Sequence, residues 1–438
     1  MVMGKLVYIK TFGCQMNEHD SERMLALLEG CGYQGTQRWE EAHLILVNTC
    51  TVREKPEQKA YSILGRFQRL KEKGPGMILG VAGCLAQQER ERMLTRFPSL
   101  DFVLGPGKSH HLPEVLREVE KGRKGLCEVG FEDHPSMGVL LPSAKQLRAY
   151  VTIMEGCDNF CSYCIVPYVR GRERSRPSRE ILTEIETLVQ MGTKEVTLLG
   201  QNVNSYAKSD PDELTFPWLL SKIDKIQGLE RIRFTTSHPK DLTEELIEAF
   251  ARLKRLCEHI HLPFQAGSNA VLERMNRGYM RDEYLAKIRR LREVAPNISI
   301  TADVMVGFPG EGEEDFAQTL DLLQEVEFDG LFSFKYSPRK GTRAARWRDD
   351  VSPEVKQRRL EILQGLQRGT TLKKNKELEG KVTEVLVEGY SRNSPQEMMG
   401  RTRCNRIVNF PGGSELVGEL VRVKIGEGLP NSLRGELC

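Results

Sequence analysis

The sequence predicts an α/β protein of three domains: a doubly wound parallel sheet, a partial (βα)6 barrel and a small antiparallel β-barrel. Two long stretches alternate short apolar runs with helical patterns, which is typical of parallel βα units. A final stretch contains only short alternating strands between Gly, Asn and Pro turns. A chain of 438 residues is also too long for a single hydrophobic core.

The first predicted domain covers residues 4–120. Its predicted strands are Leu6–Ile9, Leu44–Val47, Met77–Ala82 and Phe102–Leu104, and its predicted helices include Asp20–Leu28 and Glu57–Lys73. Cys14, Cys50 and Cys84, which we call the strand-end cysteines, come just after the first three strands. Because the carboxyl ends of parallel strands share one edge of such a sheet, these thiols could meet at one point. The alternative is three buried, inert cysteines.

Residues 121–146 interrupt this periodicity with Gly, Pro and charged residues, and they predict a linker. Residues 147–370 then resume the βα pattern. The predicted strands are Tyr150–Met154, Glu195–Leu199, Arg231–Thr235, His259–Leu262, Ile298–Val304 and Leu331–Tyr336, with helices such as Arg179–Met191 and Asp282–Val294 between them. Six such units predict an incomplete barrel, whose reactive face lies at the carboxyl ends of its strands.

The first strand of this second domain leads into a loop with three closely spaced cysteines. Cys157, Cys161 and Cys164, which we call the loop cysteines, have the spacing Cys-x3-Cys-x2-Cys. Three thiolates suit an iron–sulfur cubane and leave one iron open, and an open coordination position is the mark of a reactive metal site. The alternative is a zinc site. It needs a fourth Cys or His nearby, but the next candidates along the chain are His238 and Cys257.

Polar residues gather after the other strands of the predicted barrel. Gln201 follows the second strand, Ser237 and His238 follow the third, and Gln265 follows the fourth. Together these loops outline a pocket for a nucleoside-like cofactor. Polar loops also cap strands in general, and His238 is equally consistent with a hydrogen bond inside its loop.

The last predicted domain covers residues 371–438. Val382–Val387, Arg406–Phe410 and Glu419–Ile425 alternate as short strands separated by turn residues. This pattern predicts a small antiparallel barrel or sandwich, and small barrels of this kind often bind oligonucleotides.

The composition, with 39% hydrophobic and 29% charged residues, is ordinary for a soluble globular protein. The chain begins without a signal-peptide pattern and has no long apolar run, so we expect a cytoplasmic protein without a membrane span. Its eleven cysteines, in a large chain, indicate metal binding rather than disulfides. The net charge of +3 is small, but the basic stretches Val166–Arg179 and Lys335–Arg348 are either phosphate contacts or solvated faces.

The two groups of cysteines together resemble the methylthiotransferase family of radical S-adenosylmethionine enzymes, over nearly the whole chain. Within that family, Cys14-Gln15-Met16-Asn17 and Gly200-Gln201-Asn202-Val203-Asn204 look like the branch that acts on isopentenyladenosine in tRNA. Arg233-Phe234-Thr235-Thr236-Ser237-His238-Pro239 and Pro430-Asn431-Ser432-Leu433-Arg434-Gly435 agree with the same branch.

This resemblance implies two 4Fe–4S clusters and S-adenosylmethionine as cofactors. It assigns the radical-generating cluster to the loop cysteines and an auxiliary cluster to the strand-end cysteines. It further implies an N-terminal methylthiotransferase domain, a central radical domain and a C-terminal RNA-binding barrel of the TRAM type. Gln201, Ser237, His238 and Gln265 are then candidate contacts of S-adenosylmethionine.

The activity implied by the resemblance is methylthiolation of C2 of isopentenyladenosine next to the anticodon. The adenine C2–H is too weak an acid for a side-chain base, so the difficult steps belong to cofactors. The implied partners are the tRNA anticodon stem-loop, whose base is splayed out of its stack, and a reducing electron donor. No membrane and no DNA are expected.

Three alternatives remain open. A sibling methylthiotransferase would act on threonylcarbamoyladenosine in tRNA or on an aspartate of a ribosomal protein. A non-catalytic zinc and RNA-binding module would be colourless, whereas an iron–sulfur enzyme is brown and bleaches in air. A purely structural fold with buried cysteines would hold no metal.

Overall fold

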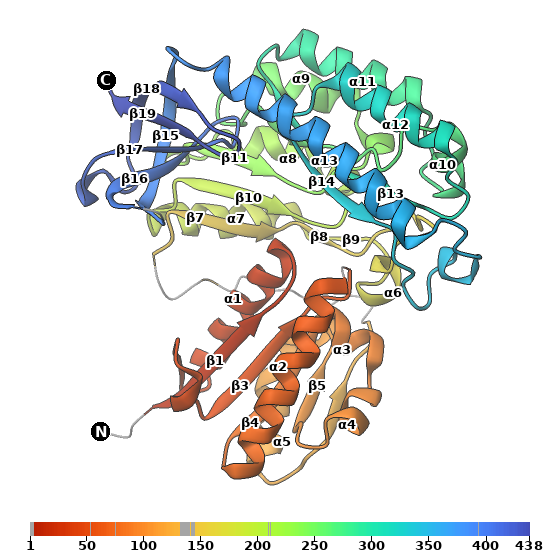
Figure 1. The fold of residues 1–438 in the computed structure, drawn as a ribbon. Helices are drawn as coiled ribbons and strands as arrows, with labels where there is room; N and C mark the ends of the chain where they lie inside the picture. The colour runs from red at the N-terminus through yellow and green to blue at the C-terminus, as the bar shows by residue number, and fades with distance from the viewer. Residues whose placement is uncertain are drawn as a thin grey trace.

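The computed structural model consists of three consecutive domains (Figure 1), and it describes residues 4–438 except 53, 75, 132–140, 142–144, 209, 211 and 393. Figure 1 shows the N-terminal domain below the central barrel, with the closed C-terminal barrel at the upper left. The predicted fold class is confirmed. Among the described residues, no helix is both long enough and apolar enough to cross a membrane.

The N-terminal domain is a six-stranded parallel sheet of order β2-β1-β3-β4-β5-β6. Its elements are β1 Lys5–Thr11, α1 Gln15–Glu29, β2 Tyr33–Gly35, β3 Leu44–Thr49, α2 Glu54–Lys73, β4 Ile78–Gly83, α3 Cys84–Glu89, α4 Arg92–Arg96, β5 Phe102–Leu104, α5 Leu112–Glu120 and β6 Leu126–Glu128. Strand β3 is buried along its whole length because helices cover both faces. Leu44 and Leu46 pack in one apolar cluster with residues of α1 and α5, and Ile45 and Val47 pack in another with residues of α2 and α4.

The segment predicted as a linker is only partly one. Strand β6 lies inside residues 121–146 and extends the sheet by pairing with β5. A three-residue strand between charged and glycine-rich flanks shows no periodicity that the sequence could reveal. The proline- and serine-containing parts of the segment, including Pro135, Pro142 and Ser143, lie outside the described residues.

The central domain contains all six predicted strands. They are β7 Arg148–Thr152, β10 Glu195–Leu199, β11 Arg231–Phe234, β12 His259–His261, β13 Ser299–Val306 and β14 Gly330–Lys335. They form two three-stranded parallel sheets, β11-β10-β7 and β12-β13-β14, and a bridge from Ile232 to Leu256 continues the first sheet toward the second. The predicted strand Tyr150–Met154 is in fact divided, because the chain turns after Thr152 into a short ribbon of β8 Met154–Glu155 and β9 Arg174–Ser175.

Helices surround these strands. They are α6 Val166–Val169, α7 Ser178–Gln190, α8 Phe216–Ile223, α9 Glu244–Arg252, α10 Asn269–Arg274, α11 Arg281–Val294, α12 Glu313–Val326 and α13 Pro353–Lys376. On β13, Ile300, Ala302, Val304 and Val306 are buried, while the alternate residues Thr301, Asp303 and Met305 are half-exposed on the opposite face. This period of two leaves one face of the barrel wall apolar against helices and the other face polar toward the barrel interior.

The C-terminal domain is a closed barrel of order β15-β16-β17-β19-β18. Its strands are β15 Val382–Ser391, β16 Ser394–Thr402, β17 Ile407–Pro411, β18 Leu420–Gly428 and β19 Leu433–Leu437. The sequence predicted three of these strands and missed β16 and β19, whose polar and glycine residues hide the alternation. One pair, β17 with β19, is parallel, so the barrel is not purely antiparallel.

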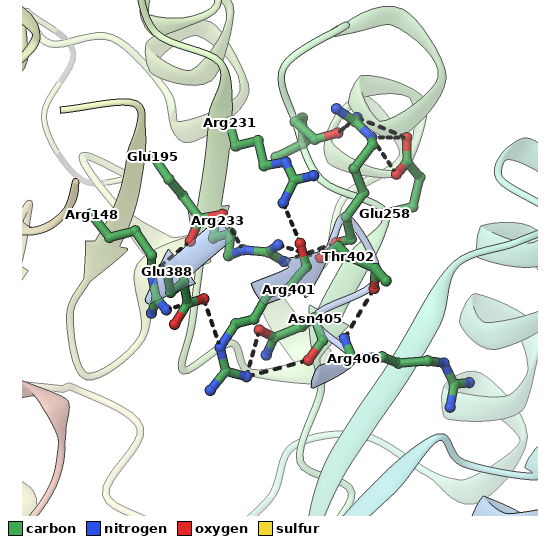
Figure 2. Close-up of polar contacts among 12 residues, drawn as sticks. Arg148, Glu195, Arg231, Arg233, Glu258, Glu388, Arg401, Thr402, Asn405 and Arg406 are labelled. Carbon is green, nitrogen blue, oxygen red and sulfur yellow. Dashed lines mark hydrogen bonds and ion pairs between the residues drawn. The ribbon is translucent and has the colours of Figure 1, made fainter. Parts of the chain in front are cut away.

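The closed barrel is attached to the amino ends of the central strands through buried arginines (Figure 2). Arg231 donates to the carbonyl of Arg401 over 2.7 Å, and Arg233 donates to the carbonyl of Thr402 over 2.7 Å. Arg403 of the closed barrel donates two hydrogen bonds of 2.8 Å to the carboxylate of Glu258 in the central domain. The reactive carboxyl ends of the central strands therefore lie on the side away from the closed barrel.

Candidate functional site

The three strand-end cysteines meet at one edge of the N-terminal sheet. Cys14 precedes α1, Cys50 follows β3, and Cys84 opens α3 directly after β4. Because β1, β3 and β4 are neighbours in the sheet, their carboxyl ends lie side by side. Burial, together with the nearby thiols of Cys84 and Cys14, raises the pKa of Cys50 to about 12. Strand order alone thus brings together three thiols that are far apart in sequence.

The buried side chain of Asn17 and the glycine at position 13 determine the backbone geometry around these cysteines. Asn17 is fully buried; its Oδ1 accepts from the backbone amide of Cys14 at 3.3 Å, and its Nδ2 donates to the Thr49 carbonyl at 3.2 Å. Gly13 has a φ of +138°, and a Cβ at this position would collide with the side chains of Asn17 and Cys50. Glycine is therefore required for the close approach of the Cys14 loop to Cys50.

The loop cysteines follow the ribbon strand β8. Gly156, with a φ of +78°, leaves no room for a Cβ against the Arg172 carbonyl, and its amide donates to Gln201 Oε1 at 2.5 Å. Burial raises the pKa of Cys157 to about 11 and that of Cys164 to about 12. In both cases the neighbouring Cys161 thiol contributes to the raised pKa.

Both groups have the donor chemistry of an iron–sulfur cluster. A buried thiol with a raised pKa, as at Cys50 or Cys164, remains protonated until a bound metal deprotonates it, which is how cysteine becomes a ligand. In the described part of the chain, no set of three or more His, Cys, Asp or Glu side chains could hold a single metal ion. A cubane binds its thiolates through different irons, so its ligands stand further apart than the donors of one zinc ion.

The two groups of cysteines lie on either side of the domain junction. Cys84 packs against Ile165 and Val169, which directly follow the loop cysteines, and α6 lies against α3 (Figure 1). Arg170 is 4% exposed and donates to Asp20 of α1 at 2.5 Å. Its guanidinium also lies 3.7 Å from Glu155. The N-terminal domain and the central barrel are thus joined at the point between the two cysteine groups.

The basic stretch Val166–Arg179 is mostly not the phosphate-binding surface that the sequence allowed. Arg170 is buried at the domain junction, where it pairs with Asp20. The buried Arg176 donates to Glu184 at 2.7 Å. The exposed Arg172 forms a bidentate pair with Asp158. Arginines that alternate along an irregular segment look basic in sequence, but here their carboxylate partners come from other elements.

The four candidate cofactor residues differ in their hydrogen bonding. Ser237 Oγ and His238 Nε2 are buried and have no hydrogen-bond partner among the described residues. Gln265 has a φ of +68°, and its backbone amide donates to the Asp303 carbonyl at 2.9 Å. Gln201 anchors the loop through Gly156. Buried polar atoms are almost always paired, so the unpartnered atoms of Ser237 and His238 fit a site that a ligand completes.

Sequence reasoning missed the segment that supports the cysteine loop from the other side, the turn between α10 and α11. Ser162 donates its amide to the Met275 carbonyl at 2.9 Å, and Asn276 Nδ2 donates to the Asn159 carbonyl at 3.1 Å. Arg277 Nη1 lies 3.4 Å from Cys161 Sγ. A turn of Asn, Arg and Gly between two helices carries no signal of this role in the sequence.

Three family models match the chain in the order of its domains. They are the Uncharacterized protein family UPF0004 at residues 6–105, the Radical SAM superfamily at residues 151–323 and the TRAM domain at residues 376–438. Among solved structures, the chain resembles the radical S-adenosylmethionine methyltransferase TsrM from Kitasatospora setae, with a TM-score of 0.60 and 14% identity. That match covers 78% of this chain and 77% of TsrM, and it supports the fold alone.

Curated relatives match far more closely. The tRNA-2-methylthio-N(6)-dimethylallyladenosine synthase of Syntrophus aciditrophicus is 55% identical over 99% of this chain and 94% of its own length. The synthase of the same name from Geotalea uraniireducens is 53% identical over 100% of both chains. The chain therefore belongs to the Radical SAM superfamily and, within it, to the family of tRNA-2-methylthio-N(6)-dimethylallyladenosine synthases, the MiaB enzymes.

Proposed function

We propose that this protein methylthiolates C2 of isopentenyladenosine next to the anticodon of tRNA, by radical S-adenosylmethionine chemistry. The observation that carries the proposal is the junction of two groups of three cysteines, in a chain more than half identical to named synthases. Each group has too few thiolates to occupy every iron of a cubane, so each leaves a position for a reactant. Two such positions match a reaction that needs both a radical and a sulfur donor.

The loop cysteines hold the radical-generating 4Fe–4S cluster, and the strand-end cysteines hold the auxiliary one. When bound, these groups and S-adenosylmethionine supply the radical and the methylated sulfur that no side chain provides. Gln201 keeps the cysteine loop in place through the amide of Gly156. Ser237, His238 and Gln265 bind S-adenosylmethionine, and the unpartnered Ser237 Oγ and His238 Nε2 support this role.

The interior of the central barrel receives the adenine. His261 Nε2 lies 3.5 Å from Asp303 Oδ1, and both residues belong to the polar inner face. The Nδ1 atom of His261 lies 3.1 Å from the Thr301 hydroxyl, which fixes the orientation of the ring. A base that leaves the anticodon loop can enter this space, since the unstacked bases of RNA loops are free to splay outward.

The partner is the anticodon stem-loop carrying isopentenyladenosine, bound in part by the closed TRAM barrel. Neither DNA nor a membrane takes part, and the enzyme works in the cytoplasm, where tRNA is modified. A low-potential electron donor supplies the electron for each radical.

The proposal is tested with the anaerobically reconstituted enzyme and two tRNA substrates that differ only in the isopentenyl group. Mass analysis of the digested nucleosides is expected to find the methylthio product only in the isopentenylated tRNA. A Cys50→Ala variant is the control for chemistry that bypasses the auxiliary site. Equal conversion of tRNA carrying threonylcarbamoyladenosine would instead favour the sibling enzyme.

A further inference from the structure

The guanidinium of Arg277 is buried beside the loop cysteines. The residue is 4% exposed, and its Nη1 lies 3.4 Å from Cys161 Sγ. Its other donors reach the Pro263 carbonyl at 2.8 Å and the Tyr279 hydroxyl at 3.2 Å. A third neutral group, the Tyr163 hydroxyl, lies 3.5 Å from Nη1. The three oxygen partners, a carbonyl and two phenol hydroxyls, carry no charge.

No carboxylate of the described residues pairs with this charge. Among the described residues, Arg277 forms no ion pair with Asp or Glu within 4 Å. Both phenols, Tyr163 and Tyr279, are neutral near pH 7 because the ordinary pKa of tyrosine is about 10. The other buried arginines of the central domain are each paired with a carboxylate. These pairs are Arg170 with Asp20, Arg176 with Glu184, Arg231 with Glu384, Arg233 with Glu195, and Arg359 with Glu311.

A buried charge without a counter-charge is expensive, so an anion that completes the site is expected next to it. The cluster proposed on the loop cysteines is that anion, since three thiolates give a 4Fe–4S centre a negative charge that grows when one electron is added. Reduction potentials of such centres depend on net charge and on hydrogen bonds to the cysteine sulfurs. Arg277 supplies both a positive charge and a hydrogen bond at Cys161.

We infer that Arg277 is a positioning residue that raises the reduction potential of the cluster on the loop cysteines and so eases its one-electron reduction. The inference rests on the proposed ligand set. In the step concerned, one electron passes from a low-potential donor to the oxidised cluster, and no bond is made or broken. The Arg277 charge stabilises the more negative, reduced form more than the oxidised form.

The test is a redox titration with dithionite, followed by the electron paramagnetic resonance signal of the reduced cluster. The full-length background variant carries Cys14→Ala, Cys50→Ala and Cys84→Ala, so that only the loop cysteines contribute. Arg277→Met removes the charge, and Arg277→Lys retains it. Arg274→Gln is the matched control, because this exposed arginine of the same segment stacks on Trp347 rather than binding a cysteine.

Arg277→Met is expected to lower the ratio of reduced to oxidised cluster on the order of tenfold at the midpoint potential of the background variant, which corresponds to 59 mV for one electron. Arg277→Lys should keep most of the background value, and Arg274→Gln should equal it. An unchanged midpoint in Arg277→Met with full iron content would overturn the inference. So would a lysine variant as low as the methionine variant, because charge would then not be the cause.

Iron analysis separates this inference from the proposed function. A background variant that folds but binds no iron contradicts the proposed ligand set itself, and with it the inference. If the background variant does not fold, the same titration is run in the otherwise unaltered chain. In that protein, the cluster on the loop cysteines is identified by the change in its paramagnetic resonance signal when S-adenosylmethionine is added. The midpoint potentials of the Arg277 variants are then compared as before.

Discussion

The two groups of cysteines are built in opposite ways. The loop cysteines lie within a single turn of chain from residue 157 to residue 164, whereas the strand-end cysteines are gathered from residues 14, 50 and 84 by the order of the strands. The first group depends on local backbone geometry and on the turn before α11. The second exists only when the parallel sheet is complete, so its integrity is a property of the whole N-terminal domain.

Each group also has one buried arginine, and the two arginines differ in their counter-charges. Arg170 faces Cys84 while it binds Asp20 and lies near Glu155, so its charge is already balanced by carboxylates. Arg277 faces Cys161 among neutral groups only. The difference indicates that Arg170 joins two domains mechanically, whereas Arg277 acts electrostatically on what the loop cysteines bind.

The largest effect expected from this comparison is that of Arg170→Met. Removing the Arg170 guanidinium leaves the Asp20 carboxylate without this partner and Glu155 with Arg174 at 3.6 Å, and breaking such a buried ion pair costs about 3–5 kcal/mol. The loss should appear in urea as an early unfolding transition of the N-terminal domain. Arg123→Ala removes an arginine from an exposed pair with Glu118 and should leave that transition in place. An Arg170 variant as stable as this control would contradict the role of Arg170 in joining the two domains.

A smaller and more selective effect is expected from two glycine substitutions. Gly13→Ala and Gly156→Ala each force a side chain into a left-handed or crowded backbone position, at a cost of about 1–3 kcal/mol. Gly13→Ala should reduce iron retention at the strand-end cysteines alone, and Gly156→Ala at the loop cysteines alone. Iron content and S-adenosylmethionine binding measure the two outcomes. Loss of both clusters in either variant would mean that the sites are not independent.

The sequence predicted what depends on periodicity and motif spacing. The order of βα units predicted the sheet edge at which the strand-end cysteines meet, and the spacing at Cys157 predicted the reactive loop. Strands β2 and β6 were missed because their residues, Tyr-Gln-Gly and Leu-Cys-Glu, do not form an apolar run like the Phe-Val-Leu of β5, which was predicted. The roles of Arg170 and Arg277 could not be predicted, because their partners, such as Asp20 and Tyr279, are set by tertiary packing.

The most direct test of the account is the iron and sulfide content of two triple variants after anaerobic purification. One variant carries alanine at the loop cysteines and the other carries alanine at the strand-end cysteines. Each variant is expected to keep about half of the iron and sulfide of the unaltered protein, because each group holds one cluster of the same type in the proposed account. If the strand-end variant lost no iron, those thiols would be structural, and methylthiolation through a second cluster would be contradicted.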